Sequence, residues 1–381
     1  LPYIYIERNK KTPYFRDVER LVRELDARSQ HDQQILEPVI EISHEPLLKH
    51  VEPLLKHVEP LLKHVSLKHE PLPLQHEPLP LQHEPLKHVV VPELSKHVLI
   101  AAEIRTGMQR AFQAYMRDAW KADEYMPVQK RGTNTFGGKG LTIIDSLDTL
   151  YLMGLHEEFG RARNFVANDF HFRGHINVFE NTIRVLGGLL SAYSLTKDEL
   201  FLTNAKMVGE VLLTAFPQRI PCGVIDTNRH GYCGAQSWSG GKSVNAEVGT
   251  LAVEFVALSK FTGDARWSDK IHAINRYWRE HDHELLRMNI DPKSERMTGP
   301  ATIGGGIDST YEYLIKLRQL TGDRLAGELY NTFEKMIVEQ MFVTYGETTF
   351  ARAAGSDELE HLGCFLGGML IMGNKYVQQG L

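Results

Sequence analysis

Five acidic side chains recur near the beginnings of three apolar segments that share one layout. The segments are residues 177–193, 246–264 and 305–323. Their acids, in chain order, are Glu180, Glu247, Glu254, Asp308 and Glu312. A cation, Arg184, follows Glu180 by one helical turn. Two carboxylates can cleave a glycosidic bond when one acid protonates the leaving oxygen and the other activates water. They can also bind a hard cation such as Ca²⁺, which takes several oxygen ligands.

The spacing of apolar residues predicts that each segment is an amphipathic helix. In the first segment the apolar positions recur with the helical period, at Val178, Ile183, Leu186, Leu189, Leu190 and Tyr193. A Thr-x-Asp turn closes each segment, and a second helical pattern follows, over residues 199–216, 265–280 and 324–342. One helical hairpin cannot bury its own apolar face, so we expect several to stack into a solenoid or a closed toroid. Each inner helix has its acids near the same end. If the hairpins close into a toroid, the carboxylates would therefore gather at one opening of the ring.

Two further segments fit the same layout. The stretch LTIIDSLDTLYLMGL is predicted to be helical, with Asp145 and Asp148 on one face. Asp145 could instead be a helix N-cap, whereas an unpaired buried carboxylate at Asp148 would be costly among apolar neighbours. Residues 357–372 are predicted to form a fifth inner helix, with Glu360 and His361 near its N-terminal end.

Composition limits the class of protein. The chain has 381 residues, of which 42% are hydrophobic, and a formal net charge of −5. These values suffice for a large core and argue against a nucleic-acid-binding surface. No run of eighteen apolar residues occurs, so no transmembrane span is predicted. Cys222 and Cys233 share one loop and could either pair or remain reduced, and Cys364 would then lack a partner in the chain.

Three regions are predicted along the chain. Residues 1–43 form an N-terminal region with one short amphipathic pattern and no clear structure. Residues 44–95 form a Pro- and His-rich heptad repeat, in which a proline in every copy opposes a coiled coil and favours extended low-complexity chain. Its histidines could also bind a divalent metal ion weakly. Residues 96–381 are predicted to be a domain of nine or ten helices, with a loop over residues 123–140 and a short hairpin within residues 287–304.

Five motifs, in this order, resemble glycoside hydrolase family 47, the class I α-1,2-mannosidases that trim high-mannose N-glycans. The motifs are LTIIDSLDTL, NVFENTIRVLGGLLSAY, AEVGTLAVEF, DSTYEYLIK and EHLGCFLGGML, and the similarity covers about residues 104–374. The resemblance implies an all-α fold, an (αα)7 barrel or toroid of helical hairpins that would be incomplete in this chain and preceded by the low-complexity region. It also implies Ca²⁺ as cofactor and inversion of the anomeric centre.

The resemblance further implies roles for individual residues. Glu180 matches the family's general acid, and Asp308 matches its second catalytic carboxylate. The residues implied to bind the sugar are Asp148, Arg184, Glu247, Glu254, Glu312 and His361. Cys364 matches one half of the family disulfide, whose partner is expected beyond Leu381.

Some family features have no match in the sequence. The family's catalytic base lies in an Arg-Pro-Glu motif, and its calcium is held by a threonine in a C-terminal hairpin; both are expected beyond Leu381, so no metal ligand is assigned. We therefore expect these 381 residues to be a fragment that does not turn over substrate. Gly306 stands where family members have an arginine or a leucine that shapes which mannose arm fits, so branch specificity stays open.

The predicted function is removal of terminal α-1,2-linked mannose from high-mannose N-glycans in the secretory pathway, in the lumen of the endoplasmic reticulum or the Golgi. No nucleic-acid partner is expected, and any membrane attachment would use an anchor that is not in this chain. Two alternatives stay open. One is a lectin-like module of glycoprotein quality control, including endoplasmic-reticulum-associated degradation, which keeps the pocket without turnover. The other is a helical scaffold for protein partners.

Overall fold

The computed structural model describes residues 96–356 and 358–373 of the chain. The chain divides into two units, Leu1–Val89 and Val90–Leu381, and all described residues belong to the second. The two regions predicted before residue 96, including the histidine-rich repeat, lie outside the described residues.

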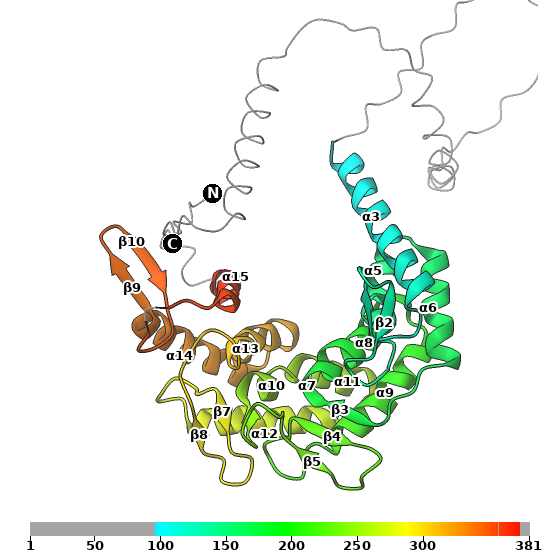
Figure 1. Cartoon of the computed structure of the whole chain (residues 1–381). Coiled ribbons are helices and arrows are strands. Elements are labelled where there is room, and N and C mark those ends of the chain that lie inside the picture. Colours follow the sequence, from blue (N-terminus) through cyan, green and yellow to red (C-terminus); the bar gives the residue numbers. More distant parts are fainter. Residues whose placement is uncertain (1–95, 357, 374–381) are drawn as a thin grey trace, which may run out of the picture. The chain divides into compact units, whose positions relative to one another are not determined.

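Two layers of antiparallel helices follow one another in a curved row (Figure 1). The inner layer comprises α4 (Leu141–Asp145), α5 (Leu147–Leu152), α7 (Val178–Glu180), η1 (Asn181–Leu186), α8 (Gly187–Thr196), α10 (Asn245–Gly249), α11 (Ala252–Thr262), α13 (Asp308–Thr321), η2 (His361–Phe365) and α15 (Leu366–Gly373). The outer layer comprises α3 (Lys96–Asp118), α6 (His156–Asn168), α9 (Glu199–Leu213), α12 (Arg266–Glu280) and α14 (Arg324–Met341). Inner helices pack on their outer partners, as α8 does on α9 and α13 on α14, and on one another. The predicted all-α fold built from helical hairpins is confirmed. None of the helices in the described part of the chain is long and apolar enough to cross a membrane.

Short antiparallel sheets lie at the beginnings of the inner helices. One hairpin pairs β1 (Glu124–Met126) with β2 (Arg131–Thr133), and another pairs β9 (Phe342–Tyr345) with β10 (Thr348–Ala351). The two three-stranded sheets are β3 (His175–Asn177), β4 (Val224–Asp226) and β5 (Cys233–Gly234), and β6 (Ser243–Val244), β7 (Asn289–Ile290) and β8 (Met297–Thr298). Strand β3 leads directly into α7 and β6 directly into α10. The sheets therefore fix where these two inner helices begin.

The turns between paired helices follow the predicted Thr-x-Asp pattern. Each inner helix ends at a residue in the left-handed region, namely Lys197, Gly263 and Gly322, with φ of 58°, 74° and 76°. The threonine hydroxyl accepts a hydrogen bond from the aspartate amide in all three turns, Thr196 from Asp198, Thr262 from Asp264 and Thr321 from Asp323. The aspartate side chain then caps the outer helix, as in α9 and α14. Local chemistry thus determines the hairpins.

Glycine allows the inner helices to approach closely. A Cβ atom at Gly188 of α8 would lie 2.6 Å from the Ile144 carbonyl oxygen of α4. A Cβ atom at Gly249 of α10 would lie 2.9 Å from the Cα atom of Thr310 in α13. Side chains at these positions would push the helices apart. The inner helices that begin with acidic residues are therefore held side by side.

The long helix predicted over residues 177–193 is less regular than expected. It begins as α7, passes through the π-helix η1 and continues as α8. The Thr182 hydroxyl donates to the carbonyl of Val178 at 2.7 Å, and the Asn181 carboxamide donates to the carbonyl of Asn177 at 2.8 Å. Side chains that bond the carbonyl four residues earlier distort the helix locally, and π-helical turns occur often at functional sites.

Other predicted elements need correction. The helix predicted over residues 141–155 is interrupted at Ser146, between α4 and α5. Asp145 is the last residue of α4 and not an N-cap, because its carboxylate faces Arg184 instead. The loop predicted over residues 123–140 contains the hairpin β1–β2. The second predicted inner helix is divided into α10 and α11, and the fifth begins with the 3₁₀ turn η2. The short hairpin predicted after α12 is confirmed as β7–β8.

Candidate active site

Glu180 lies at the start of the longest inner element, where its carboxylate is paired with a guanidinium. The Asn177 side chain caps α7 by accepting a hydrogen bond from the Glu180 amide at 2.9 Å. Arg184 Nε donates to Glu180 Oε2 at 2.7 Å, and its Nη1 lies 3.5 Å from Asp145 Oδ2. The Arg184 guanidinium also lies over the ring of Phe136, 5.9 Å from its centroid. Glu180 is therefore held in one orientation while 22% of its side chain stays exposed.

The two aspartates of α4 and α5 differ in environment. Burial raises the pKa of Asp145, an effect that Arg184 opposes and the charges of Asp148 and Glu180 reinforce. Asp148 accepts a hydrogen bond from Ser191 Oγ at 2.7 Å and another from the backbone amide that follows it at 2.6 Å. Asp148 therefore joins α5 to α8, and its carboxylate has the partners that burial among apolar neighbours requires.

Glu247 is the third residue of α10 and interacts with Glu180. Burial raises the pKa of Glu247 to about 7, the Gln236 carboxamide opposes this rise, and the negative charge of Glu180 reinforces it. The helix that carries Glu247 packs against α7 on one side and α13 on the other. A carboxyl group with a pKa of about 7 can donate or accept a hydrogen bond near neutral pH.

Glu254 lies between helices and is only 8% exposed. The Tyr313 hydroxyl on α13 donates to Glu254 Oε1 at 3.1 Å. On the other side the carboxylate approaches Gly187, where a Cβ atom would lie 3.7 Å from Oε1. Burial raises the pKa of Glu254 to about 7, against the hydrogen bond from Tyr313. Glu254 therefore connects the helix that follows Glu180 to the helix that begins at Asp308.

Asp308 is the first residue of α13, and one backbone amide stabilises its carboxylate. Its Oδ1 accepts a hydrogen bond from the Ser309 amide at 2.8 Å. Burial raises the pKa of Asp308, the Ser309 amide opposes this rise, and the charges of Glu312 and Glu360 reinforce it. Glu312 pairs with Lys316 one turn later, at 2.7 Å. Asp308 thus lies in a carboxylate-rich environment.

Glu360 contributes to this environment although the sequence analysis gave it no role. Its Oε2 accepts a hydrogen bond from the amide of Gly305 at 2.7 Å, just before α13. The neighbouring His361, predicted to contact the sugar, begins η2 and is exposed. The sequence places both residues at the start of the fifth inner helix but does not show which of them approaches α13.

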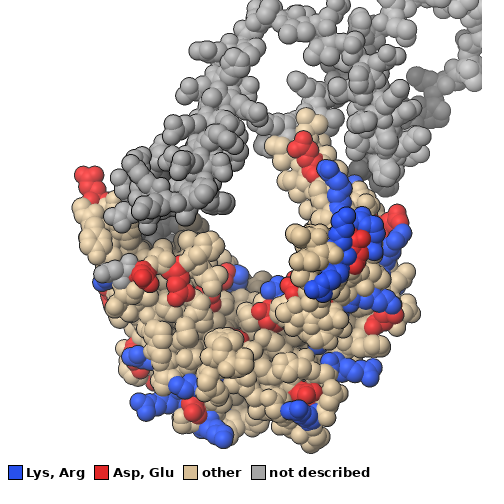
Figure 2. Space-filling view, in the orientation of Figure 1, with Lys and Arg blue, Asp and Glu red and all other residues tan. Residues whose placement is uncertain are grey.

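Most of the predicted acids, together with Glu360, therefore form two neighbouring groups. The Glu180 group consists of Asp145, Glu180, Glu247 and the cation Arg184, and the Asp308 group consists of Asp308, Glu312, Glu360 and the cation Lys316. Helix α10 lies between the two, since it contacts both α7 and α13. Figure 2 shows acidic side chains along the edge of the hollow on the inner side of the helices. Paired carboxylates on one surface suit glycosidic cleavage or sugar binding.

The described residues do not fit a calcium ion. Over residues 96–356 and 358–373, no group of three or more His, Cys, Asp or Glu side chains is placed to hold a metal ion. Glu180 and Asp145 instead contact Arg184, and Asp308 and Glu360 accept hydrogen bonds from backbone amides. We therefore derive no step through a metal.

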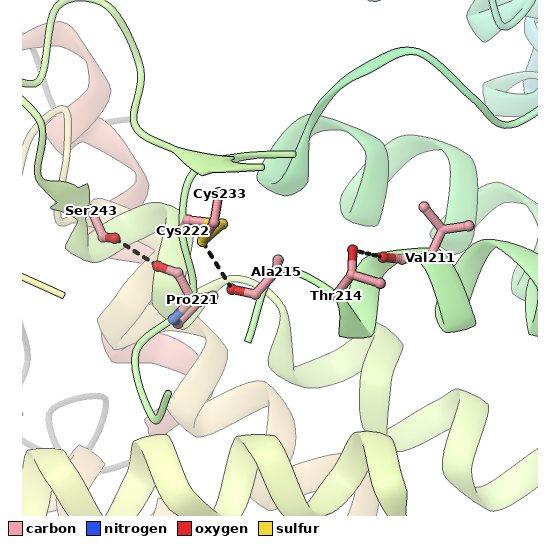
Figure 3. Close-up of a disulfide and its surroundings, with 7 residues drawn as sticks. All are labelled: Val211, Thr214, Ala215, Pro221, Cys222, Cys233 and Ser243. Carbon is pink, nitrogen blue, oxygen red and sulfur yellow. Dashed lines mark hydrogen bonds between the residues drawn. A yellow bond between two sulfur atoms is a disulfide. The ribbon is translucent and has the colours of Figure 1, made fainter. Parts of the chain in front are cut away.

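Cys222 and Cys233 form a disulfide (Figure 3), which confirms one of the two alternatives left open by the sequence. Their Cα atoms are 5.6 Å apart, and the bond joins the residues before β4 to the start of β5. Cys364 is exposed and forms no disulfide within the part of the chain that the structure describes. Its pairing with a cysteine beyond Leu381 stays a prediction.

Several known proteins have sequences similar to this chain. The sequence profile of glycosyl hydrolase family 47 matches residues 107–380. The mannosyl-oligosaccharide 1,2-alpha-mannosidase MNS1 of Arabidopsis thaliana is 36% identical over 288 residues, which are 71% of this chain and 51% of that protein. Mannosyl-oligosaccharide 1,2-alpha-mannosidase IC of Homo sapiens is 38% identical over 290 residues, 71% of this chain and 45% of that protein. The chain spans about half the length of the curated relatives it matches.

A solved structure shows the same fold. The alpha-1,2-mannosidase from Trichoderma reesei aligns with a TM-score of 0.63 at 23% sequence identity, over 74% of this chain and 66% of that one. At this identity the likeness concerns the fold alone. The profile match covers most of the chain and includes both acidic groups. The chain therefore belongs to glycosyl hydrolase family 47.

Proposed function

We propose that this chain binds terminal α-1,2-linked mannose of high-mannose N-glycans and supplies the acid for its inverting hydrolysis. The observation that supports this best is the Glu180 carboxylate, which Arg184 orients at 2.7 Å and which lies beside Glu247 of another hairpin. The names of the relatives from Arabidopsis thaliana and Homo sapiens describe the same cleavage.

The groups divide the chemistry between them. Glu180 protonates the leaving oxygen as the glycosidic bond breaks, directly or through a water molecule. Asp308 stabilises the positive charge that develops on the sugar ring in the transition state. The remaining acids and Arg184 bind hydroxyl groups of the terminal mannose, because carboxylates and guanidinium groups together offer acceptors and donors. High-mannose glycans occur on proteins of the secretory pathway, so we place the chain there. Ca²⁺ stays an expectation of the family resemblance.

Isothermal titration calorimetry with α-1,2-linked mannobiose tests the binding. The unmodified chain is expected to bind, and Asp308→Asn is expected to weaken binding about tenfold because one hydrogen-bonding carboxylate is lost. Glu347→Gln is a matched control, since Glu347 is exposed in the turn between β9 and β10. Equal affinities for the two variants would favour a scaffold for protein partners over a sugar site.

A release assay with Man9GlcNAc2 separates catalysis from binding. If the chain releases mannose, Glu180→Gln is expected to abolish release while leaving mannobiose binding within about threefold, because the carboxamide can still accept from Arg184. Binding without release would fit a lectin-like module. Absence of binding by the unmodified chain would overturn the proposal.

A further inference from the structure

One loop brings a carboxamide to the Glu180 group from outside the inner helices. We call residues 222–236 the disulfide loop: the Cys222–Cys233 bond closes residues 222–233 (Figure 3), and Gln236 follows three residues after Cys233. Strands β4 and β5 pair within it. Just beyond it, the Ser239 hydroxyl donates to the carbonyl of Gln236 at 3.0 Å. The position of Gln236 is therefore fixed by a covalent bond, a strand pair and a side-chain hydrogen bond.

Gly223 is the point at which the disulfide loop meets the site. Its carbonyl accepts a hydrogen bond from the amide of Val178, at the start of α7, at 2.9 Å. A Cβ atom at Gly223 would lie 3.0 Å from Glu247 Oε2 and 3.7 Å from both Cγ and the backbone nitrogen of Gln236. Only a residue without a side chain leaves this space free. Gln236 and Glu247 therefore lie on either side of the same small gap.

The polar ends of these two side chains are complementary and unpaired. Gln236 Nε2 and Glu247 Oε2 are both buried, and neither has a hydrogen-bond partner among the described residues. The carboxamide lowers the pKa of Glu247 as a hydrogen-bond donor does, although Gln236 Nε2 and Glu247 Oε2 do not form a hydrogen bond of ordinary length and angle. Buried polar atoms in proteins are nearly always paired. A donor and an acceptor left unpaired side by side therefore indicate a ligand group that satisfies both.

A hydroxyl group has the required chemistry, because it accepts from an N–H group and donates to a carboxylate oxygen. We propose that Gln236 and Glu247 together bind one hydroxyl group of the terminal mannose, so that Gln236, held by the disulfide loop, determines which sugar fits. This inference rests on the proposed function. It adds a residue outside the inner helices to the site, and it gives the Cys222–Cys233 bond a role in positioning that residue.

Calorimetry with methyl α-D-mannopyranoside and its four monodeoxy analogues tests the pair. Gln236→Met keeps the shape of the side chain and removes its donor, so the affinity for the complete sugar is expected to fall about tenfold. For the analogue that lacks the recognised hydroxyl, the unmodified chain and Gln236→Met are expected to bind equally. Gln218→Met is the matched control, since Gln218 is exposed and precedes the disulfide loop. Gln236→Glu, which cannot donate when ionised, serves if the methionine variant does not fold.

The outcomes separate the two proposals. If the unmodified chain binds no mannoside, the proposed function fails, and the sugar role of Gln236 fails with it. If the chain binds and the Gln236 and Gln218 variants have equal affinities for every sugar, only the inference about Gln236 is overturned.

A titration without sugar tests the geometry of the pair. In the chain labelled with ¹³C at glutamate carboxyl groups, the pKa of Glu247 is expected to rise further in Gln236→Met and to stay unchanged in Gln218→Met. Glu180 is the other charged group that acts on Glu247, and it is the same in both variants. An identical Glu247 pKa in the two variants would show that Gln236 does not reach the carboxylate, and would overturn the inference independently of sugar binding.

Discussion

The Glu180 group and the Asp308 group both place carboxylates at the beginnings of neighbouring inner helices, but they stabilise them differently. In the Glu180 group one guanidinium, that of Arg184, contacts two carboxylates. In the Asp308 group two backbone amides each contact a carboxylate, and Lys316 pairs with Glu312 alone. Stabilisation is therefore concentrated on one side chain in the first group and distributed over the backbone in the second.

This difference determines how each group responds to mutation. A planar guanidinium with several fixed donors orients its carboxylates as well as neutralising them, and no other side chain replaces it. Backbone amides, by contrast, persist whatever side chain is present. The Glu180 group should therefore be sensitive to a single substitution, whereas the Asp308 group should tolerate the loss of its cation.

Arg184→Met is expected to have the largest effect on sugar binding. It leaves the partly buried carboxylate of Glu180 and the more exposed one of Asp145 without a cation. Mannobiose binding should therefore weaken by about 30-fold, on the order of 2 kcal/mol. The same substitution should raise the pKa of Asp145 further, because Arg184 now opposes the effect of burial. Calorimetry and ¹³C titration of the aspartate carboxyl groups measure the two effects.

Lys316→Met is the matched change in the Asp308 group. Lys316 and Glu312 are both partly exposed, at 37% and 26% of their side chains, and such ion pairs contribute little. Binding should weaken by less than about threefold. Arg184→Lys should recover only part of the lost affinity, because an ammonium group cannot contact two carboxylates with the same geometry. Equal losses for Arg184→Met and Lys316→Met would contradict the contrast between the groups.

Glu254→Gln is expected to change stability in a pH-dependent way, because Glu254 lies between the helices of the two groups. Its pKa is about 7 in the folded chain and 4.5 when unperturbed. Between these values the folded chain retains a proton that the unfolded chain has released, so the free energy of unfolding falls as pH rises from about 4.5 to 7. A neutral glutamine removes this dependence. At pH 8 the variant should be more stable than the unmodified chain by about 3 kcal/mol, and at pH 4.5 about equally stable.

Glu158 provides a control of opposite sign. It is also buried, at 3% exposure, but hydrogen bonds from Gln109 and Gln113 outweigh the effect of burial and lower its pKa. Its stabilising contribution is therefore present above pH 4.5 and is lost as pH falls through its lowered pKa. Urea unfolding at pH 8 should show Glu158→Gln to be less stable than the unmodified chain by about 1 kcal/mol. If both glutamine variants are less stable than the unmodified chain at pH 8, the pKa of Glu254 is not raised in the folded chain.

Features that depend on local sequence were predictable. The spacing of apolar residues predicted the paired helices, and the Thr-x-Asp turns predicted where they end. These turns are local, because the threonine and aspartate hydrogen bonds join residues only two or three apart. The acids at the helix starts could be located for the same reason. Their convergence follows from the packing of α10 against both α7 and α13.

Features that depend on distant contacts were not predictable. The interruption at Ser146 occurs where α8 approaches the end of α4 at Gly188, and no local pattern signals this contact. Glu360 reaches Gly305 across 55 residues. Gln236 lies in a Gly-rich loop without a period, and only the Cys222–Cys233 bond shows where that loop is held. The spacing of the two cysteines was the available signal.

Gly223→Ala and Gly305→Ala together test the contrast between the groups with the smallest chemical change. A methyl group at Gly223 would lie 3.0 Å from Glu247 Oε2, closer than ordinary contact, so the carboxylate must move. At Gly305 the nearest atoms, Glu360 Oε2 and Leu362 Cδ1, would both lie 3.5 Å away, an ordinary contact. Mannobiose affinity should therefore fall about fivefold, near 1 kcal/mol, for Gly223→Ala and remain within twofold for Gly305→Ala. Melting temperatures measured alongside should differ little between the variants, because both positions lie in loops. If Gly305→Ala weakened mannobiose binding more than Gly223→Ala, the sterically sensitive contact would lie in the Asp308 group. The Asp308 group, and not the Glu180 group, would then be the one more sensitive to a single substitution.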